Sequence, residues 1–271
     1  MPKSFALPVK KKVDLTAIDP SDTGGILSKE EIIEETLKLK EEFQELQEML
    51  VAGKKQAVLF VFQGMDCSGK DGVIKHVFSG LNPQGVSSYS FKTPTEEESL
   101  HDFLWRAHTR TPALGHITTF NRSYYEDVLI TRVHDLITDK VAKRRFKHIN
   151  HFEELLNENH TLVVKIFLHI SKEFQMKKLK SRIEDPSKNW KLDPNDIEER
   201  KSWKQHRKHY EEVLEKCSSA SPWYIVPSDH RWYRDFVVLS IAVESLRSLK
   251  LKEPDPNPEL IRFLEQIAKE D

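Results

Sequence analysis

Cysteines and long apolar segments are scarce in this chain of 271 residues. Its two cysteines, Cys67 and Cys217, lie far apart, so they form neither a disulfide framework nor a metal-ligand spacing. The longest apolar run, residues 57–62, is far too short to span a bilayer, and no apolar signal segment follows the first residues. These absences exclude a disulfide-stapled secreted domain and a membrane-spanning helix, and they predict a cytoplasmic protein.

The net charge of −1 excludes a whole-molecule field that would attract nucleic acid or a membrane surface. The charge is nevertheless uneven, because residues 30–48 are rich in glutamate and residues 172–208 are rich in cations. Those cations are Lys172, Lys177, Lys178, Lys180, Arg182, Lys188, Lys191, Arg200, Lys201, Lys204, Arg207 and Lys208. The basic segment indicates a local anionic partner, although ordinary solvated helix faces explain the same pattern.

Apolar periodicity predicts strands that alternate with helices, within a single domain over residues 1–271. The strands are predicted at about 57–63, 85–91, 115–121, 161–170 and 223–226. Predicted features between and around them are an N-terminal arm (1–28), a helix (29–53) capped by Ser28, helices at 95–108, 123–136 and 138–158, a lid (172–200), a long charged helix ending near 217, a helix at 230–250 and a C-terminal helix (254–271). Such alternation predicts a parallel sheet between two helix layers, with its site at the carboxyl ends of the strands.

The strand at 57–63 leads into a glycine loop with the G-x-x-x-x-G-K spacing of a phosphate-binding loop. Glycines let the backbone N–H groups turn toward an anion, and Lys70 adds a mobile positive charge. Asp71 stands where such loops usually have a magnesium-binding Ser or Thr, which argues against an ordinary ATPase or GTPase. The phosphate contacts predicted here are Gly64, Ser68, Gly69, Lys70, Asp71 and Lys75.

Two carboxylate-bearing segments lie at the ends of predicted strands. Asp66 inside the loop would repel a phosphate unless a cation lies between them, so it is a candidate metal ligand or an orienting base; a simple turn-forming Asp is the alternative. Asn121 ends the third strand, with Glu126 in the turn after it as a further candidate metal ligand. Arg122 is placed to bridge phosphates, although a capped helix with a surface arginine fits the same residues.

Two further groups complete the candidate site. In the lid, Arg182 and Lys191 are the predicted phosphate contacts, because cations over a phosphate site stabilise transferred charge and the lid excludes water; a solvated amphipathic hairpin is the alternative. The predicted nucleotide contacts are Lys92, Thr93, Arg106, Asn121 and Tyr125.

Five segments together resemble the family-2 polyphosphate kinases. They are Gly-Met-Asp-Cys-Ser-Gly-Lys-Asp-Gly (64–72), Phe-Asn-Arg-Ser-Tyr-Tyr-Glu-Asp (120–127), Phe-Leu-His-Ile-Ser-Lys (167–172), Arg-Ile-Glu-Asp-Pro-Ser-Lys-Asn-Trp-Lys (182–191) and Pro-Trp-Tyr-Ile-Val-Pro (222–227). The similarity extends from about residue 12 to 250, and Asp71 after the loop lysine is typical of the family.

The resemblance implies a three-layer α/β/α P-loop kinase fold like that of thymidylate kinase, with a helical lid. It implies reversible, Mg²⁺-dependent phosphoryl transfer between inorganic polyphosphate and AMP or ADP, yielding ADP and ATP, with guanine nucleotides as further acceptors and Mn²⁺ as a substitute metal. By the same resemblance Asp66 binds metal and orients the terminal phosphate, Lys70 and Arg122 hold phosphates, and Arg182 neutralises the migrating group. Asn121, where many members have Asp, points to the subgroup that accepts AMP as well as ADP and moves metal binding toward Glu126.

Two other functions remain open on the sequence. An ATP-dependent nucleotide or metabolite kinase would share the loop and the lid, but it does not readily explain Asp71 or the surplus of cations. A non-enzymatic nucleotide- or polyphosphate-binding protein would bind without turnover. We also expect a homo-oligomer, a dimer or tetramer, because the apolar stripe of the helix at 29–50 could pack on its own domain or on a second subunit.

Overall fold

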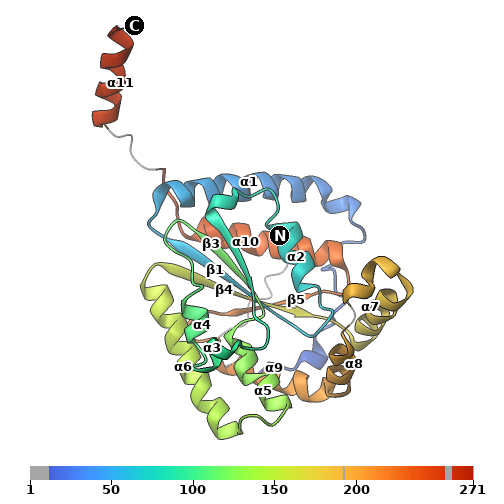
Figure 1. Cartoon of the computed structure of the whole chain (residues 1–271). Helices are drawn as coiled ribbons and strands as arrows, with labels where there is room; N and C mark the ends of the chain where they lie inside the picture. The colour runs from blue at the N-terminus through green and yellow to red at the C-terminus, as the bar shows by residue number, and fades with distance from the viewer. Residues whose placement is uncertain (1–11, 192, 254–257, 271) are drawn as a thin grey trace.

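The computed structural model describes residues 12–191, 193–253 and 258–270. Its centre is a sheet of five parallel strands in the order β2-β3-β1-β4-β5 (Figure 1). The strands are β1 (Ala57–Gln63), β2 (Val86–Ser90), β3 (Ile117–Asn121), β4 (Thr161–His169) and β5 (Trp223–Pro227). In register, Phe62 lies beside Asn121 of β3 and Ile166 of β4, so β1, β3 and β4 bring their carboxyl ends to one edge of the sheet.

Helices cover both faces of this sheet (Figure 1). One layer contains α1 (Ile33–Gly53), α2 (Lys70–Val77) and α10 (Arg231–Ser248), and the other contains α6 (Asp139–Glu158) and α9 (Trp203–Lys216). Alternate residues of β1 face the two layers, since Phe60 packs with the first and Leu59 with the second. All seven residues of β1 are therefore buried, which explains its continuous apolar sequence.

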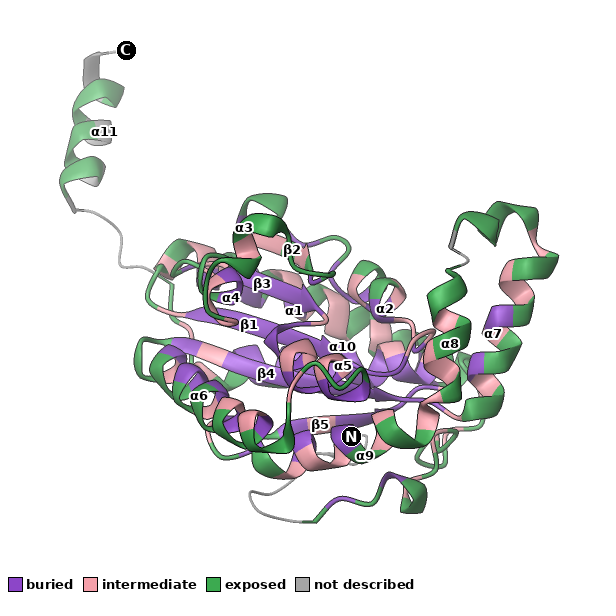
Figure 2. Ribbon diagram, turned by 60° about the horizontal axis from the view of Figure 1, so that its bottom comes forward, coloured by how far each residue is buried: buried purple, intermediate pink, exposed green. Residues whose placement is uncertain are grey.

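The lid follows β4 directly and consists of three short segments. They are α7 (Lys172–Glu184), the 3₁₀ segment η5 (Pro186–Lys191) and α8 (Pro194–Lys201). Figure 2 shows α7 projecting from the end of the sheet with mostly exposed residues; Gln175 and Leu179 are its buried ones. The lid therefore begins at the same sheet edge as the phosphate loop.

Shorter segments complete the described chain. They are the 3₁₀ turns η1 (Leu15–Ala17), η2 (Glu30–Ile32), η3 (Pro83–Gly85) and η4 (Tyr124–Val128), and the helices α3 (Glu96–Ser99), α4 (Trp105–His108), α5 (Ile130–Val133) and α11 (Pro258–Glu270). In the part of the chain that the structure describes, no helix is long and apolar enough to cross a membrane. The predicted features at residues 1–11, 254–257 and 271 lie outside the described residues.

The predicted strands are confirmed to within two residues at each end, but four predicted helices were wrong in detail. The helix expected at 95–108 is two helices, because Asp102 Oδ1 accepts the N–H of Leu104 and starts a new turn; Thr95 caps the first of them. The helix expected at 123–136 begins as the 3₁₀ turn η4, and the long helix expected before residue 217 breaks at Ser202. Finally, α1 starts after Ile32, so Ser28 does not cap it.

Candidate active site

The phosphate loop between β1 and α2 is built on left-handed backbone. Gly64, Cys67 and Gly69 have φ of 154°, 66° and 89°, and Gly69 precedes the first turn of α2. The Nζ of Lys70 donates to the carbonyls of Gly64 (2.8 Å) and Met65 (3.2 Å), so the lysine folds back over its own loop. Burial, and then the nearby charge of Arg122, lower the pKa of Lys70. An anion in the loop would relieve both effects.

Arg234 of α10 supports the loop from behind. Its Nη1 donates to the carbonyl of Ser68 (3.3 Å), while Nε and Nη2 both donate to Asp235 Oδ1 (2.8 and 2.6 Å). The Arg234 guanidinium is buried and lies where a Cβ on Gly69 would be. Sequence reasoning missed this residue, because nothing in the pattern of a distant helix shows that it will reach the loop.

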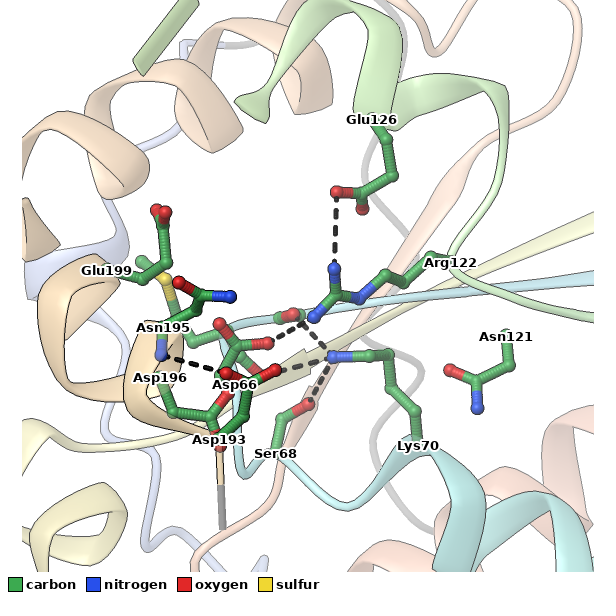
Figure 3. A network of polar contacts seen from close by, with 12 residues as sticks. Asp66, Ser68, Lys70, Asn121, Arg122, Glu126, Asp193, Asn195, Asp196 and Glu199 are labelled. Carbon is green, nitrogen blue, oxygen red and sulfur yellow. Dashed lines mark hydrogen bonds and ion pairs between the residues drawn. The ribbon is translucent and has the colours of Figure 1, made fainter. Parts of the chain in front are cut away.

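Arg122 lies at the centre of the site, directly after β3. Its backbone is left-handed (φ 59°), and its N–H donates to the carbonyl of Phe62 at the end of β1 (3.0 Å). Nη2 pairs with Asp66 Oδ1 at 2.5 Å, and Nη1 lies 3.8 Å from Glu126 Oε2. Figure 3 shows the guanidinium between the two carboxylates. The charge of Glu126, with that of Asp66, raises the pKa of Arg122 despite burial, so the group stays cationic.

The two carboxylates beside Arg122 differ in their tendency to ionise. Burial opposes the charge of Asp66, but Arg122 and Lys70 together hold the pKa of Asp66 below its usual value. Burial dominates at Glu126 and raises its pKa. Asp66 is therefore the carboxylate that stays ionised and can bind a metal ion, while Glu126 serves mainly to anchor Arg122.

The predicted metal set of Asp66, Asn121 and Glu126 is not assembled. Asn121 Nδ2 donates to Asp71 Oδ1 (2.5 Å), and Figure 3 shows Asn121 on the opposite side of Lys70 from Asp66. Across residues 12–191, 193–253 and 258–270, no group of three or more His, Cys, Asp or Glu side chains is placed to hold a metal ion. Asp71 instead links α2 to the end of β3, which gives this departure from the usual Ser or Thr a structural role.

A cleft opens above these residues. It is lined by Gly64, Met65, Asp66, Arg122, Glu126, Leu129, Ile130, Gln175, Glu199, Trp203, His206 and Tyr210. Tyr210 donates to the carbonyl of Gly64 (3.2 Å), and Gln175 of the lid donates to the carbonyl of Asp66 (3.0 Å). The last three lining residues repeat at i, i+3 and i+7 along α9, and this spacing is the signal by which the sequence could have revealed them.

The lid brings one predicted residue toward the cleft. Arg182 Nη1 pairs with Asp196 Oδ2 of α8 at 2.5 Å, so the arginine ties two lid segments together. The charge of Asp66 helps to raise the pKa of Asp196, after burial, which shows that the two carboxylates are close. The side chain of Lys191, the other predicted lid contact, lies outside the described residues.

Several predicted site residues lie elsewhere. Lys75 is exposed on α2, and Lys92 and Thr93 are exposed in the loop after β2. Arg106 and Tyr125, which were predicted to contact the nucleotide, are instead buried. Arg106 pairs with Asp127 (3.2 Å), and Tyr125 is fully buried. Both residues lie near the carboxyl ends of the strands, as predicted, but their side chains point into the interior. Burial also raises the pKa of Cys67 to about 11, so its thiol stays protonated and is a poor nucleophile.

A parallel sheet flanked by helices, a phosphate loop after β1 and a charged lid after β4 define a P-loop kinase fold. Residues 26–254 match the family described as Polyphosphate kinase 2, and the chain belongs to this family. The resemblance seen in the sequence is thereby confirmed.

Named relatives match over nearly the whole chain. An "AMP/ADP-polyphosphate phosphotransferase" of Meiothermus ruber is 40% identical over 94% of this chain and 96% of its own length. An "ADP-polyphosphate phosphotransferase" of Rhodopseudomonas palustris is also 40% identical, over 98% of each chain. The crystal structure of Polyphosphate Kinase 2 from Arthrobacter aurescens superposes with a TM-score of 0.88 at 36% identity, covering 96% of this chain and 98% of that one.

The packing of Arg234 on the loop predicts a specific cost for a side chain at Gly69. Gly69→Ala should lower the free energy of unfolding by about 1–3 kcal/mol more than Gly25→Ala, because it adds overpacking to the same backbone strain. Gly25 has the same φ of 89° but open space around it, so it is a matched control. Urea denaturation of the two variants measures the difference, and equal losses would show that Arg234 does not constrain the loop.

Proposed function

We propose that this chain transfers phosphoryl groups between inorganic polyphosphate and AMP or ADP, with Mg²⁺ bound at the phosphates. The observation that carries the proposal is the convergence of Arg122 and Asp66 at one cleft, beside the phosphate loop with its Lys70 and under a lid rich in cations. Membership of the family and the names of the two relatives at 40% identity support the same reaction.

Phosphoryl transfer needs positioning and charge neutralisation more than covalent groups. In our proposal Lys70 leaves the carbonyls of its own loop for the phosphates, while the backbone N–H groups of the loop hold them. Arg122 stays in place through Glu126 and offers its other donors to the transferred group. Asp66 orients the attacking phosphate oxygen, and its lowered pKa keeps it ionised to do so.

The residues of the cleft fit a magnesium ion that is held mainly by phosphates and water. Mg²⁺ prefers oxygen ligands and is often bound through one or two carboxylates, with phosphates and water completing its shell. Asp66 supplies one such carboxylate, and Asp196 lies close enough to affect it electrostatically. When bound with substrate, the ion would neutralise phosphate charge. We propose Asp66 as its protein ligand.

The lid provides the proposed track for the polyphosphate chain. Burial, and then the nearby cations Arg231, Lys177, Arg234 and Lys188, lower the pKa of Lys178 on α7 to about 8. Like charges held this close repel one another, so a bound polyanion would relieve the repulsion. Arg234 also supports the phosphate loop from behind, so this cationic cluster lies next to the loop.

The acceptor range is the finer part of the proposal. The two relatives at equal identity carry different printed names, one with AMP and ADP and one with ADP alone. We propose both acceptors for this chain, because the β3 strand ends in Asn121 rather than a carboxylate. Its amide satisfies Asp71, so one negative charge fewer faces the phosphates.

Removal of either central charge should stop turnover while leaving the fold intact. Asp66→Asn and Lys70→Ala should each lower the rate of polyphosphate-dependent ATP formation from ADP by at least about 100-fold, as for other lost electrostatic contacts at reacting groups. Lys38→Ala, at an exposed lysine on α1, is the control and should keep the wild-type rate. Near-normal rates in either site variant would refute the site assignment.

The lowered pKa of Lys178 predicts a pH dependence of polyphosphate binding. Below about pH 8 the free lysine is charged and attracts the chain; above it the proton is lost, so the KM for polyphosphate should rise, by up to about tenfold per pH unit. The KM measured between pH 7 and 9.5 tests this. Lys178→Arg keeps its charge throughout, so its rise should be smaller; identical profiles would contradict the role of Lys178.

A further inference from the structure

A fully buried ionic cluster lies behind the Arg122 turn, outside the cleft. Lys165 of β4 and Glu153 of α6 are both completely buried, and Lys165 Nζ pairs with Glu153 Oε2 at 2.5 Å. The other oxygen of Glu153, Oε1, accepts from the hydroxyls of Tyr124 (2.8 Å) and Tyr125 (2.6 Å). Both tyrosines belong to η4, the turn that follows Arg122.

The ammonium of Lys165, both oxygens of Glu153 and the hydroxyls of Tyr124 and Tyr125 all have hydrogen-bond partners. Lys165 Nζ donates to three acceptors, because it also reaches the Tyr125 hydroxyl (3.1 Å) and the Cys217 carbonyl (2.6 Å). The ammonium lies 5.2 Å from the centroid of the Trp223 ring and 5.6 Å from that of Tyr125. Burial, together with the charge of Glu153, holds the pKa of both tyrosines well above the usual value, so their hydroxyls remain donors.

A buried ion pair of this kind is a poor source of stability. Removing two charges from water costs about as much as their attraction returns, and apolar residues of similar volume often do as well or better. What a satisfied polar network provides is a single arrangement, because any shift leaves a buried donor or acceptor without its partner. The cluster therefore fixes the positions of Tyr124 and Tyr125 more strongly than apolar packing would.

The fixed turn carries the residues of the site. Arg122 has a left-handed backbone that a non-glycine residue adopts only when its surroundings impose it. Ser123 Oγ accepts from Gln63 Nε2 at the end of β1 (3.2 Å), which ties the same turn to the strand before the phosphate loop. Glu126 follows Tyr125 directly and pairs with Arg122. Along the chain, Tyr124 and Tyr125 thus lie between Arg122 and Glu126, the residue that anchors its guanidinium.

We propose that Glu153 is a positioning residue for phosphoryl transfer, which sets the place of Arg122 by holding Tyr124 and Tyr125. This inference rests on the proposed function for the role of Arg122. Glu153 does not touch the cleft and acts only through the turn. A displacement of the turn by a fraction of an ångström would move both the Arg122 guanidinium and the Glu126 carboxylate relative to Asp66.

The test is a mutant cycle between the cluster and the arginine. Glu153→Gln should lower kcat by about tenfold, and Tyr125→Phe by about threefold, because misplaced catalytic groups lose rate steeply. In an Arg122→Lys background, the same changes should lower kcat by less than about twofold, since the group that they position is already altered. Tyr125→Phe, which leaves the ion pair in place, gives the answer should Glu153→Gln fail to fold.

A control and a second readout separate positioning from stability. Gln47→Ala removes an equally buried side chain that bonds to Asn82 in the layer of α1; it should lower the melting temperature with kcat unchanged. The affinity for inorganic tripolyphosphate, measured by calorimetry, should weaken by at least about threefold in Tyr125→Phe and less in the Arg122→Lys background.

The outcomes are distinct. Equal kcat losses in both backgrounds, or variants that lose only thermal stability as Gln47→Ala does, would overturn the role of Glu153. Wild-type protein that binds tripolyphosphate but gives no turnover would contradict the proposed function alone, and the calorimetric cycle would then still decide on the positioning role.

Discussion

The arrangement of the site depends on one ionic contact, the pairing of the Arg122 guanidinium with Asp66 and Glu126. The contact joins the phosphate loop after β1 to the turn after β3, which are far apart in the sequence. It places Arg122 and the two carboxylates at a partly buried cleft, beside the buried Lys70 of the loop. These two cations and two carboxylates balance in charge without substrate. Arg122 nevertheless repels Lys70, and this repulsion adds to burial in lowering the pKa of Lys70. A phosphate is the ligand that such a pair of cations accepts most readily.

Both halves of this contact are held from behind by buried charge. Arg234 with Asp235 supports the phosphate loop, and Glu153 with Lys165 supports the Arg122 turn. Neither pair lines the cleft. In a fold whose catalysis rests on positioning, these supports bear on rate as much as on stability. They also explain why polar residues occur inside strands and helices that are otherwise apolar.

Much of the fold and the centre of the site could be predicted from the sequence. The parallel strands could be predicted because helices cover both of their faces, which makes their sequences continuously apolar. The carboxyl ends of such strands meet at one edge of the sheet, so Asp66 and Arg122 were expected to lie together. Arg234 could not be foreseen, because the orientation of α10 depends on tertiary packing. Tyr125 was misread because its partner Glu153 lies on a separate helix, so the pattern around Tyr125 alone suggests an exposed turn.

The central claim is that polyphosphate is the phosphoryl donor and that both AMP and ADP are acceptors. It is tested most directly by chromatography of the nucleotides formed when the protein is incubated with Mg²⁺, inorganic polyphosphate and either AMP or ADP. We predict ATP from ADP, and ADP followed by ATP from AMP. The absence of product with polyphosphate, together with transfer to AMP when ATP is the donor, would contradict the claim and identify an ATP-dependent nucleotide kinase instead.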